Sequence, residues 1–236
     1  MNKQCYISKI LKNAKKLKAI NFLGGKCKYC GEDDFFKLVF HHIDPNQKEF
    51  EISRIIDNGW YRIEKEIKKC ELVCYNCHQE LHYGEQRNKR CKNNKKILLE
   101  IKNVDGCELC GYNKSDVSLS FHHIGEKKNV FSDFTYEFKS IYDVENSIME
   151  ELNTCQVLCI NCHTKLHSDV EFFELHKDEI IEKSLNLKSQ YHQSKLDREL
   201  IKKMYFDDKM KQVDIAKYFN ASHGTISDII KELKLL

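Results

Sequence analysis

The sequence predicts an α+β fold in which two copies of a small metal-braced unit are followed by an all-helical segment. Three observations lead to this prediction: a duplicated sequence block, four Cys-x-x-Cys pairs, and a C-terminal stretch whose apolar residues recur at helical spacing. With 236 residues, of which 41% are hydrophobic, the chain is long enough for several small units but leaves each a modest core.

The duplication is visible in two pairs of matching blocks. CKYCGEDDFFKLVFHHIDPNQKEF at 27–50 returns as CELCGYNKSDVSLSFHHIGEKKNVF at 107–131, first at an offset of 80 residues and then of 81. CELVCYNCHQELH at 70–82 returns as CQVLCINCHTKLH at 155–167, at an offset of 85. Insertions therefore fall between the matched blocks, and we expect two modules, at 27–84 and 107–168.

Each module is expected to contain a CxxCG turn, a β-leaning run (FFKLVFHHI or VSLSFHHI), a longer connection and a short helix near the second CxxC pair. Lysine-rich helical stretches precede the modules, at 1–26 and 85–106. They are read either as solvated helix faces or as arms that contact a DNA backbone. Residues 169–195 are expected to form a helical connector without chemistry of its own.

Composition excludes some classes of protein. The net charge is only +3, but residues 1–26 carry seven lysines and no acidic residue, so local basic segments matter more than the total. No apolar run approaches the roughly 20 residues of a membrane span, and we expect a cytoplasmic protein, in the host cytoplasm if phage-encoded. In that reducing compartment the twelve cysteines are expected to bind metal rather than form disulfides.

Two CxxC pairs in each module can enclose one tetrahedral zinc ion, because the two-residue gap lets both thiolates of a pair point at an ion about 2.3 Å away. A lone pair could be redox-active or accidental, whereas four pairs in matched order indicate structural zinc. We expect both sites to be closed, non-catalytic and a source of folding energy. The expected ligands are Cys27, Cys30, Cys74 and Cys77 in the first module and Cys107, Cys110, Cys159 and Cys162 in the second.

Four histidines recur in each module: His41, His42, His78 and His82, then His122, His123, His163 and His167. Residues i and i+4 of a helix share a face, so His78 and His82 can reach one ion or one phosphate. Neighbouring strand residues point in opposite directions, so of His41 and His42 one is expected to bind metal and the other to act as a base. Phosphodiester hydrolysis needs both a base that activates water and a cation that stabilises the developing charge.

The combination of CxxCG, FHHI and CxNCHxxLH resembles the HNH endonucleases, which have a ββα-metal core braced by a four-cysteine zinc site. The resemblance covers residues 27–82 and 107–167 and implies a β-hairpin packed on a helix. The family commonly has Asp-His at the end of the first strand. By position, His41 and His122 replace the Asp as metal ligands, while His42 and His123 match the general base.

The resemblance also implies the remaining parts of a catalytic metal site. The residue directly after the last zinc cysteine, His78 or His163, is the other metal ligand, and His82 and His167 are further ligands or phosphate contacts. The implied cofactors are two structural Zn²⁺ ions and a catalytic divalent metal, Mg²⁺ or Mn²⁺. An all-histidine shell would also suit zinc or nickel.

The Asn that gives the family its name is displaced here. Cys70 and Cys155 stand four residues before the second CxxC, where many relatives have Asn, and the sequence does not fix their role. Asn76 and Asn161 lie inside the knuckles instead, and we expect them to take the catalytic role. Alternatively the histidines are structural, or one copy is only a DNA clamp; retention of every motif residue in both copies favours two active centres.

The C-terminal segment, 196–236, has apolar residues at helical spacing throughout, with a break at NASHG where Ser222 can cap the second helix. It resembles the helix-turn-helix of phage and bacterial DNA-binding proteins, with IAKYF in the supporting helix and TISDIIKEL in the recognition helix. The resemblance implies that Ser222, His223, Thr225 and Ser227 face the major groove. A plain three-helix packing module is the alternative.

Together these features predict an HNH-type endonuclease that hydrolyses double-stranded DNA with a divalent metal, homing-type or phage-encoded. It is expected to be a monomer that acts as a pseudo-dimer and does not associate with membranes. Two alternatives stay open: a type II-like restriction endonuclease, which would need a cognate methyltransferase, and a non-catalytic zinc and helix-turn-helix DNA-binding regulator. The regulator is disfavoured because zinc knuckles alone do not require paired HH strands and HxxxH helices.

Overall fold

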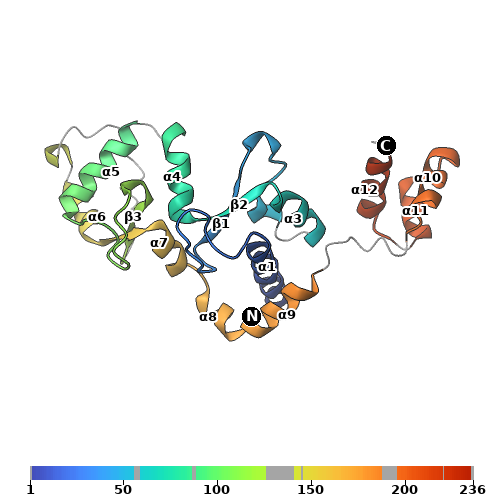
Figure 1. Ribbon diagram of the computed structural model, residues 1–236, viewed down its shortest axis with the longest axis horizontal. Helices are drawn as coiled ribbons and strands as arrows, with labels where there is room; N and C mark the ends of the chain where they lie inside the picture. Colours follow the sequence, from blue (N-terminus) through green and yellow to red (C-terminus); the bar gives the residue numbers. More distant parts are fainter. Residues whose placement is uncertain are drawn as a thin grey trace. The chain divides into compact units, whose positions relative to one another are not determined.

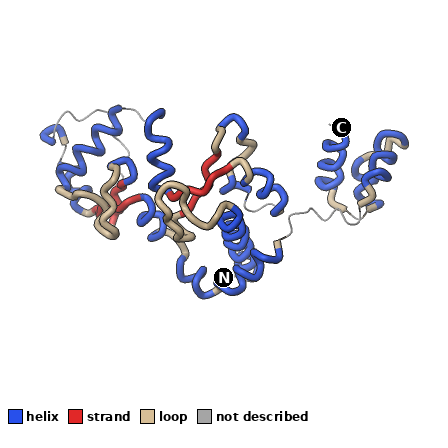
Figure 2. Tube along the Cα trace, viewed as in Figure 1, coloured by secondary structure: helices blue, strands red, loops and turns tan. Residues whose placement is uncertain are grey.

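The computed structural model describes residues 2–55, 59–86, 89–125, 141–144, 146–187, 196–219 and 221–234 (Figure 1). The chain divides into two compact units, Met1–Leu187 and Lys188–Leu236. Within the described residues the fold is α+β, with helices surrounding two separate two-stranded antiparallel sheets (Figure 2). Among the described helices, none is both long and apolar enough to cross a membrane.

The first sequence repeat folds around a β-hairpin. Its elements are α1 Lys3–Phe22, β1 Leu38–His42, η1 Pro45–Gln47, α2 Ile52–Ile55, α3 Trp60–Ile67, β2 Cys70–Cys74 and α4 Tyr75–Gln86. In the hairpin, Leu38 pairs with Cys74 and His42 with Cys70. The predicted strand at the HHI motif and the predicted helix at the second CxxC pair are confirmed, whereas β2 forms where the residue pattern alone predicted a connection.

In the second repeat a helix again precedes the first strand, and a helix comes directly before and directly after the second strand. Its elements are α5 Lys89–Lys102, η2 Asp116–Ser118, β3 Leu119–His123, η4 Ile141–Asp143, α6 Asn146–Asn153, β4 Cys155–Cys159 and α7 Ile160–Leu166. Its register matches that of the first repeat residue for residue, with Leu119 opposite Cys159 and His123 opposite Cys155. Residues 126–140, part of the connection predicted in this repeat, lie outside the described residues.

The last helices of the first unit pack against its first helix. Helices α8 Val170–Leu175 and α9 Lys177–Asn186 follow the second repeat, and α9 runs alongside α1 (Figure 1). Ile10 and Ala14 of α1 are buried there with Phe36, Phe173 and Ile180. The lysine-rich N-terminal stretch is therefore a helix with one side in a core and the other in solvent, and the stretch predicted to connect the units packs on it as far as residue 187.

The second unit is all-helical within its described residues. It contains α10 Arg198–Lys202, the π-helical turn η5 Lys203–Asp207, α11 Gln212–Tyr218 and α12 His223–Lys234. Its buried core is made by Ile201, Met204, Ile215, Ala216, Ile226, Ile229 and Ile230. The Ser222 hydroxyl oxygen accepts a hydrogen bond from the Thr225 backbone N–H at 3.1 Å, which confirms the predicted helix cap.

Within the first unit, the two repeats meet at the N-terminal turns of α4 and α7. The backbone N–H of Asn76 donates to Oδ1 of Asn161, and that of Asn161 donates to Oδ1 of Asn76, both at 3.0 Å. The two residues are 4% and 6% exposed. Because each residue gives and receives the same bond, the contact has the reciprocal character of a two-fold symmetric interface.

A second set of contacts surrounds this asparagine pair. Glu80 of the first repeat and Lys165 of the second occupy equivalent positions, at the offset of 85. Glu80 accepts a hydrogen bond from the Tyr112 hydroxyl, and Lys165 pairs with Asp34 at 2.6 Å. Each helix thus reaches the loop that follows the first CxxC pair of the other repeat, and the two repeats pack as a pseudo-symmetric pair.

Replacing Asn161 by alanine is expected to lower the free energy of unfolding by about 1–3 kcal/mol, because the buried N–H of Asn76 loses its partner. Asn76→Ala should cost a similar amount. The double variant should cost less than the sum of the two, since both bonds belong to one contact. Urea unfolding of the zinc-loaded protein measures these values, with the exposed Asn21→Ala as control. Additive losses no larger than that of the control would show that the pair does not hold the repeats together.

Candidate metal centres and catalytic histidines

The two cysteine tetrads predicted from the sequence are assembled in the structure. In each repeat the four Sγ atoms lie within 4.8 Å of one another. Tetrahedral zinc with Zn–S bonds of about 2.3 Å would hold its thiolates about 3.8 Å apart. The Sγ atoms of Cys30 and Cys74 are separated by 3.6 Å and those of Cys110 and Cys159 by 3.7 Å, so the tetrads fit this ion.

The chemistry of the thiols also fits a cation. Burial and the neighbouring Cys74 raise the pKa of Cys77 above its ordinary value. Burial opposes ionisation of Cys27 as well, but backbone N–H groups of Cys30 and Tyr29 lower its pKa to about 7. Four thiols this close cannot all ionise unless a positive charge compensates them. Residues of both tetrads could therefore hold structural zinc.

A glycine shapes the turn after the first CxxC pair of each repeat. Gly31 and Gly111 adopt positive φ angles of 79° and 72°, which residues with a side chain rarely tolerate. Their N–H groups donate to the carbonyls of Cys27 and Cys107 at 3.0 and 2.8 Å. The turn folds each pair so that its two thiols face the same point.

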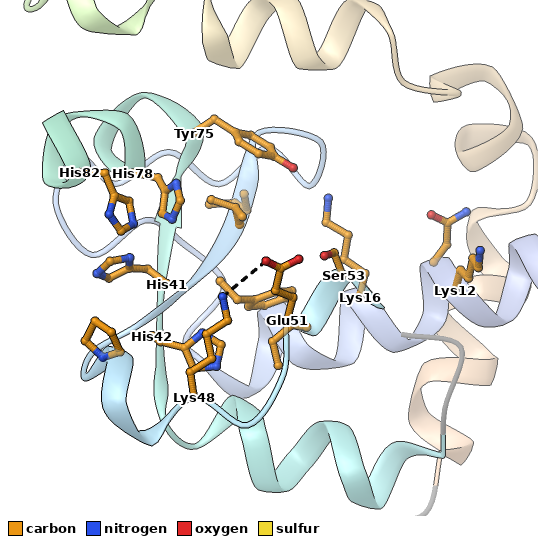
Figure 3. Close-up of a pocket in the computed structure, with 16 residues that line it drawn as sticks. Lys12, Lys16, His41, His42, Lys48, Glu51, Ser53, Tyr75, His78 and His82 are labelled. Carbon is orange, nitrogen blue, oxygen red and sulfur yellow. Dashed lines mark ion pairs between the residues drawn. The ribbon is translucent and has the colours of Figure 1, made fainter. Parts of the chain in front are cut away.

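Strand β1 and helix α4 bring three histidines of the first repeat together. His41, His78 and His82 each place a ring nitrogen within 4.8 Å of the others, and their rings turn toward one another (Figure 3). Burial, with His82 and His41 nearby, lowers the pKa of His78 to about 4. Burial likewise lowers the pKa of His41. The buried imidazoles are therefore neutral near pH 7, the form that binds metal ions.

The second repeat assembles the same triad from His122, His163 and His167, again with ring nitrogens within 4.8 Å. Here one ligand is also oriented by a hydrogen bond. The Ser120 hydroxyl donates to the Leu158 carbonyl at 3.0 Å, so its oxygen accepts from Nδ1 of His163, also at 3.0 Å. That bond leaves Nε2 of His163 free for a metal ion. Val39 takes the place of Ser120 in the first repeat.

The remaining histidine of each HH pair points the other way, to a buried carboxylate. Nε2 of His42 lies 2.7 Å from Oε1 of Glu66, which is 1% exposed. Burial raises the pKa of Glu66, but hydrogen bonds from Lys69 and His42 outweigh it and lower the pKa. An ionised Glu66 accepts the proton on Nε2, so Nδ1 of His42 carries the free lone pair and can act as a base.

His123 has the equivalent partner in the second repeat. Its Nε2 lies 2.6 Å from Oε1 of Glu151, which is also 1% exposed. Neither Glu66 nor Glu151 was predicted from the sequence. The available signal was an E-x-x-x-C pattern, EIKKC and ELNTC, repeated at the offset of 85.

The same pattern explains the matched cysteines outside the tetrads. Cys70 and Cys155 are buried, and their thiols donate to the backbone carbonyls of Glu66 and Glu151 at 3.5 and 3.3 Å. Each cysteine lies opposite the histidine that its glutamate contacts, in the pairs His42–Cys70 and His123–Cys155. Their role is to fix the end of the helix that carries the carboxylate.

The structure places Asn76 and Asn161, which were predicted to be catalytic, between the two repeats. Both side chains are buried in the contact between the repeats, where their oxygens accept backbone N–H groups. Asn76 also forms a side-chain hydrogen bond to Cys159, a tetrad residue of the other repeat; burial raises the pKa of Cys159, and this bond opposes the rise. These contacts give both asparagines a structural role between the repeats, while their catalytic role stays a prediction.

A pocket of about 530 Å³ opens beside the first histidine triad. Figure 3 shows the triad at one end and Lys12 and Lys16 of α1 at the other, with Lys48 and Glu51 between them. His42 also lines this pocket. A substrate entering it would meet both the triad and the histidine that can act as a base.

The four residues predicted to contact DNA from the second unit lie at the start of α12 and just before it. Ser222 and His223 are exposed, and Thr225 and Ser227 are partly exposed. The hydroxyls of Ser222 and Thr225 lie 2.7 Å apart, within the helix cap. Comparison with protein-family models, curated protein sequences and solved structures gives no match to this chain.

Proposed function

We propose that the protein is an HNH-type endonuclease that hydrolyses phosphodiester bonds of double-stranded DNA with a divalent metal ion held by each histidine triad. One observation carries the proposal: adjacent residues of one strand place a triad histidine on one side and a carboxylate-bound histidine on the other, and both repeats do this. Phosphodiester hydrolysis requires a base that activates water and a cation that stabilises the developing charge, and a cation site beside a positioned base can supply both.

In the first repeat His41, His78 and His82 would hold the ion, and in the second His122, His163 and His167. Bound there, Mg²⁺ or Mn²⁺ would act as a Lewis acid toward the scissile phosphate and the leaving 3′ oxygen. His42 or His123 accepts a proton from the attacking water at Nδ1. Glu66 or Glu151 keeps each imidazole in the required tautomer and stabilises the imidazolium that forms.

The second unit would position the enzyme on its substrate. Helix α12 has an exposed N-terminal turn with small polar side chains, which is the part of a recognition helix that reads base edges in the major groove. Two centres linked in one chain would allow each to cut one strand, so a monomer would act as a pseudo-dimer.

The test is cleavage of supercoiled plasmid by the zinc-loaded full-length protein with Mg²⁺, with Mn²⁺ and without added divalent metal. We expect nicked and then linear plasmid only when one of these ions is present. Failure to cut plasmid or linear duplex DNA under any of these conditions would overturn the proposal and favour a DNA-binding regulator.

Glu66→Gln is expected to lower kcat on the order of 10- to 100-fold with little change in KM, because glutamine keeps the size of the side chain but not the charge that orients and stabilises His42. The variant is best made together with His123→Ala, so that only the first centre remains. Glu49→Gln in the same background is the control, since Glu49 contacts Lys69 but not His42. Equal kcat values for the two glutamine variants would remove Glu66 from the mechanism.

A further inference from the structure

The duplication extends into the helices that precede the cysteine knuckles. KILKNAKK at 9–16 in α1 returns as KRCKNNKK at 89–96 in α5, at the same offset of 80 as the first CxxC pair. The shared pattern is K-x-x-K-N-x-K-K. Since the proposed chemistry uses none of these residues, the shared lysines and asparagine call for a separate explanation.

One lysine position of the pattern, Lys15 in the first copy and Lys95 in the second, is at least partly buried in both copies. Lys15 is only 8% exposed, and the amine of its equivalent, Lys95, donates to the Val117 carbonyl at 3.0 Å. This contact ties α5 to the segment that leads into strand β3. The lysines on either side of this position, Lys12 and Lys16 in the first copy, face the pocket instead.

Lys12, Asn13 and Lys16 line the pocket that contains the first histidine triad. Positions 12 and 16 are four residues apart and share a face of α1, and Figure 3 shows both at the end of the pocket away from the triad. The pocket volume of about 530 Å³ falls within the range of about 300–1,000 Å³ that accepts small organic ligands, the size class of a nucleotide.

The charge of the pocket favours an anion. Three lysines line it, Lys12, Lys16 and Lys48, against one carboxylate, Glu51, which lies 3.5 Å from Lys48. Burial lowers the pKa of Lys16 to about 8 even though Asp34 opposes the shift. Its amine lies 4.5 Å from the centre of the Phe35 ring. A poorly solvated ammonium group gains more from an arriving phosphate than a fully hydrated one.

We infer that Lys12 and Lys16 bind a backbone phosphate of DNA beside the one that is cleaved. The inference rests on the proposed function and names the residues that position its substrate.

The test compares two double variants with the same loss of charge: Lys12→Gln/Lys16→Gln, and Lys3→Gln/Lys26→Gln at exposed positions outside the pocket. Binding of a fluorescent 20-base-pair duplex is measured by anisotropy over a salt series, without added divalent metal. The pocket variant loses its contact with one phosphate, so its slope of log K against log [salt] should fall by about 0.9, and the slope of the control should fall much less. KM for plasmid cleavage should rise only in the pocket variant.

The two proposals can fail separately. Wild-type protein that cuts DNA while the pocket and control variants share one salt slope and one KM would overturn the lysine inference alone. Protein that never cuts DNA but shows the lysine-dependent slope would support phosphate binding and overturn the nuclease.

Discussion

Replacing both His42 and His123 by alanine is expected to lower the rate of metal-dependent DNA cleavage by about 10²–10⁴-fold, the usual contribution of a positioned general base. Both metal triads remain intact in this variant, so binding of Mn²⁺ should be unchanged. The loss would then arise from proton transfer alone. Plasmid cleavage measures the rate, and zinc content and circular dichroism show that the variant folds.

The single variants should behave differently from the double variant. His42→Ala leaves the second centre intact and His123→Ala leaves the first, so each should still nick supercoiled plasmid but convert it to the linear form slowly. His176→Ala, which changes a histidine outside both centres, serves as the control. Wild-type rates in the double variant would show that neither histidine is the base.

Removal of zinc is expected to unfold the first unit and to leave the second folded. Structural zinc contributes about 10–16 kcal/mol of apparent binding free energy in zinc-finger peptides, which is comparable with the roughly 5–15 kcal/mol that stabilises a typical domain. Both tetrads belong to the first unit. No cysteine follows Cys162 in the sequence, and the second unit has its own apolar core.

Two-dimensional ¹H–¹⁵N NMR spectra recorded before and after addition of a strong chelator test this prediction. Amide signals from the described helices and strands of the first unit should collapse to random-coil positions, while those of α10 to α12 should stay dispersed. Cys74→Ser should weaken zinc retention, and Cys5→Ser, at an exposed cysteine outside the tetrads, should not. A chelated protein whose first unit keeps its dispersed signals would contradict the structural role assigned to zinc.

The parts of the site that follow from local spacing were predictable from the sequence. The CxxC gap lets two thiols point at one ion, and the four-residue spacing of His78 and His82 places both rings on one helix face. The structure confirms both arrangements. Alternation along a strand also separates His41 from His42 as expected. These predictions succeed because each depends on the geometry of a single element.

The parts that depend on packing between elements were not predictable. Glu66 is one of many glutamates in the chain, and only the packing of α3 on the hairpin shows that it is buried against His42. Asn76 was assigned to catalysis on the basis of the motif, yet its partner is Asn161, far away in the sequence. The pocket that joins Lys16 to the triad likewise requires α1 to be placed beside β1.

The central claim is that the histidine triads hold the metal ion that DNA cleavage requires. The most direct test measures plasmid cleavage against Mn²⁺ concentration for the wild type and for His78→Ala/His163→Ala, at equal zinc content. We predict saturable metal-dependent cleavage by the wild type and none above background by the variant, although its cysteine tetrads keep their zinc. Equal cleavage by the two proteins, or no metal-dependent cleavage by the wild type, would contradict the claim.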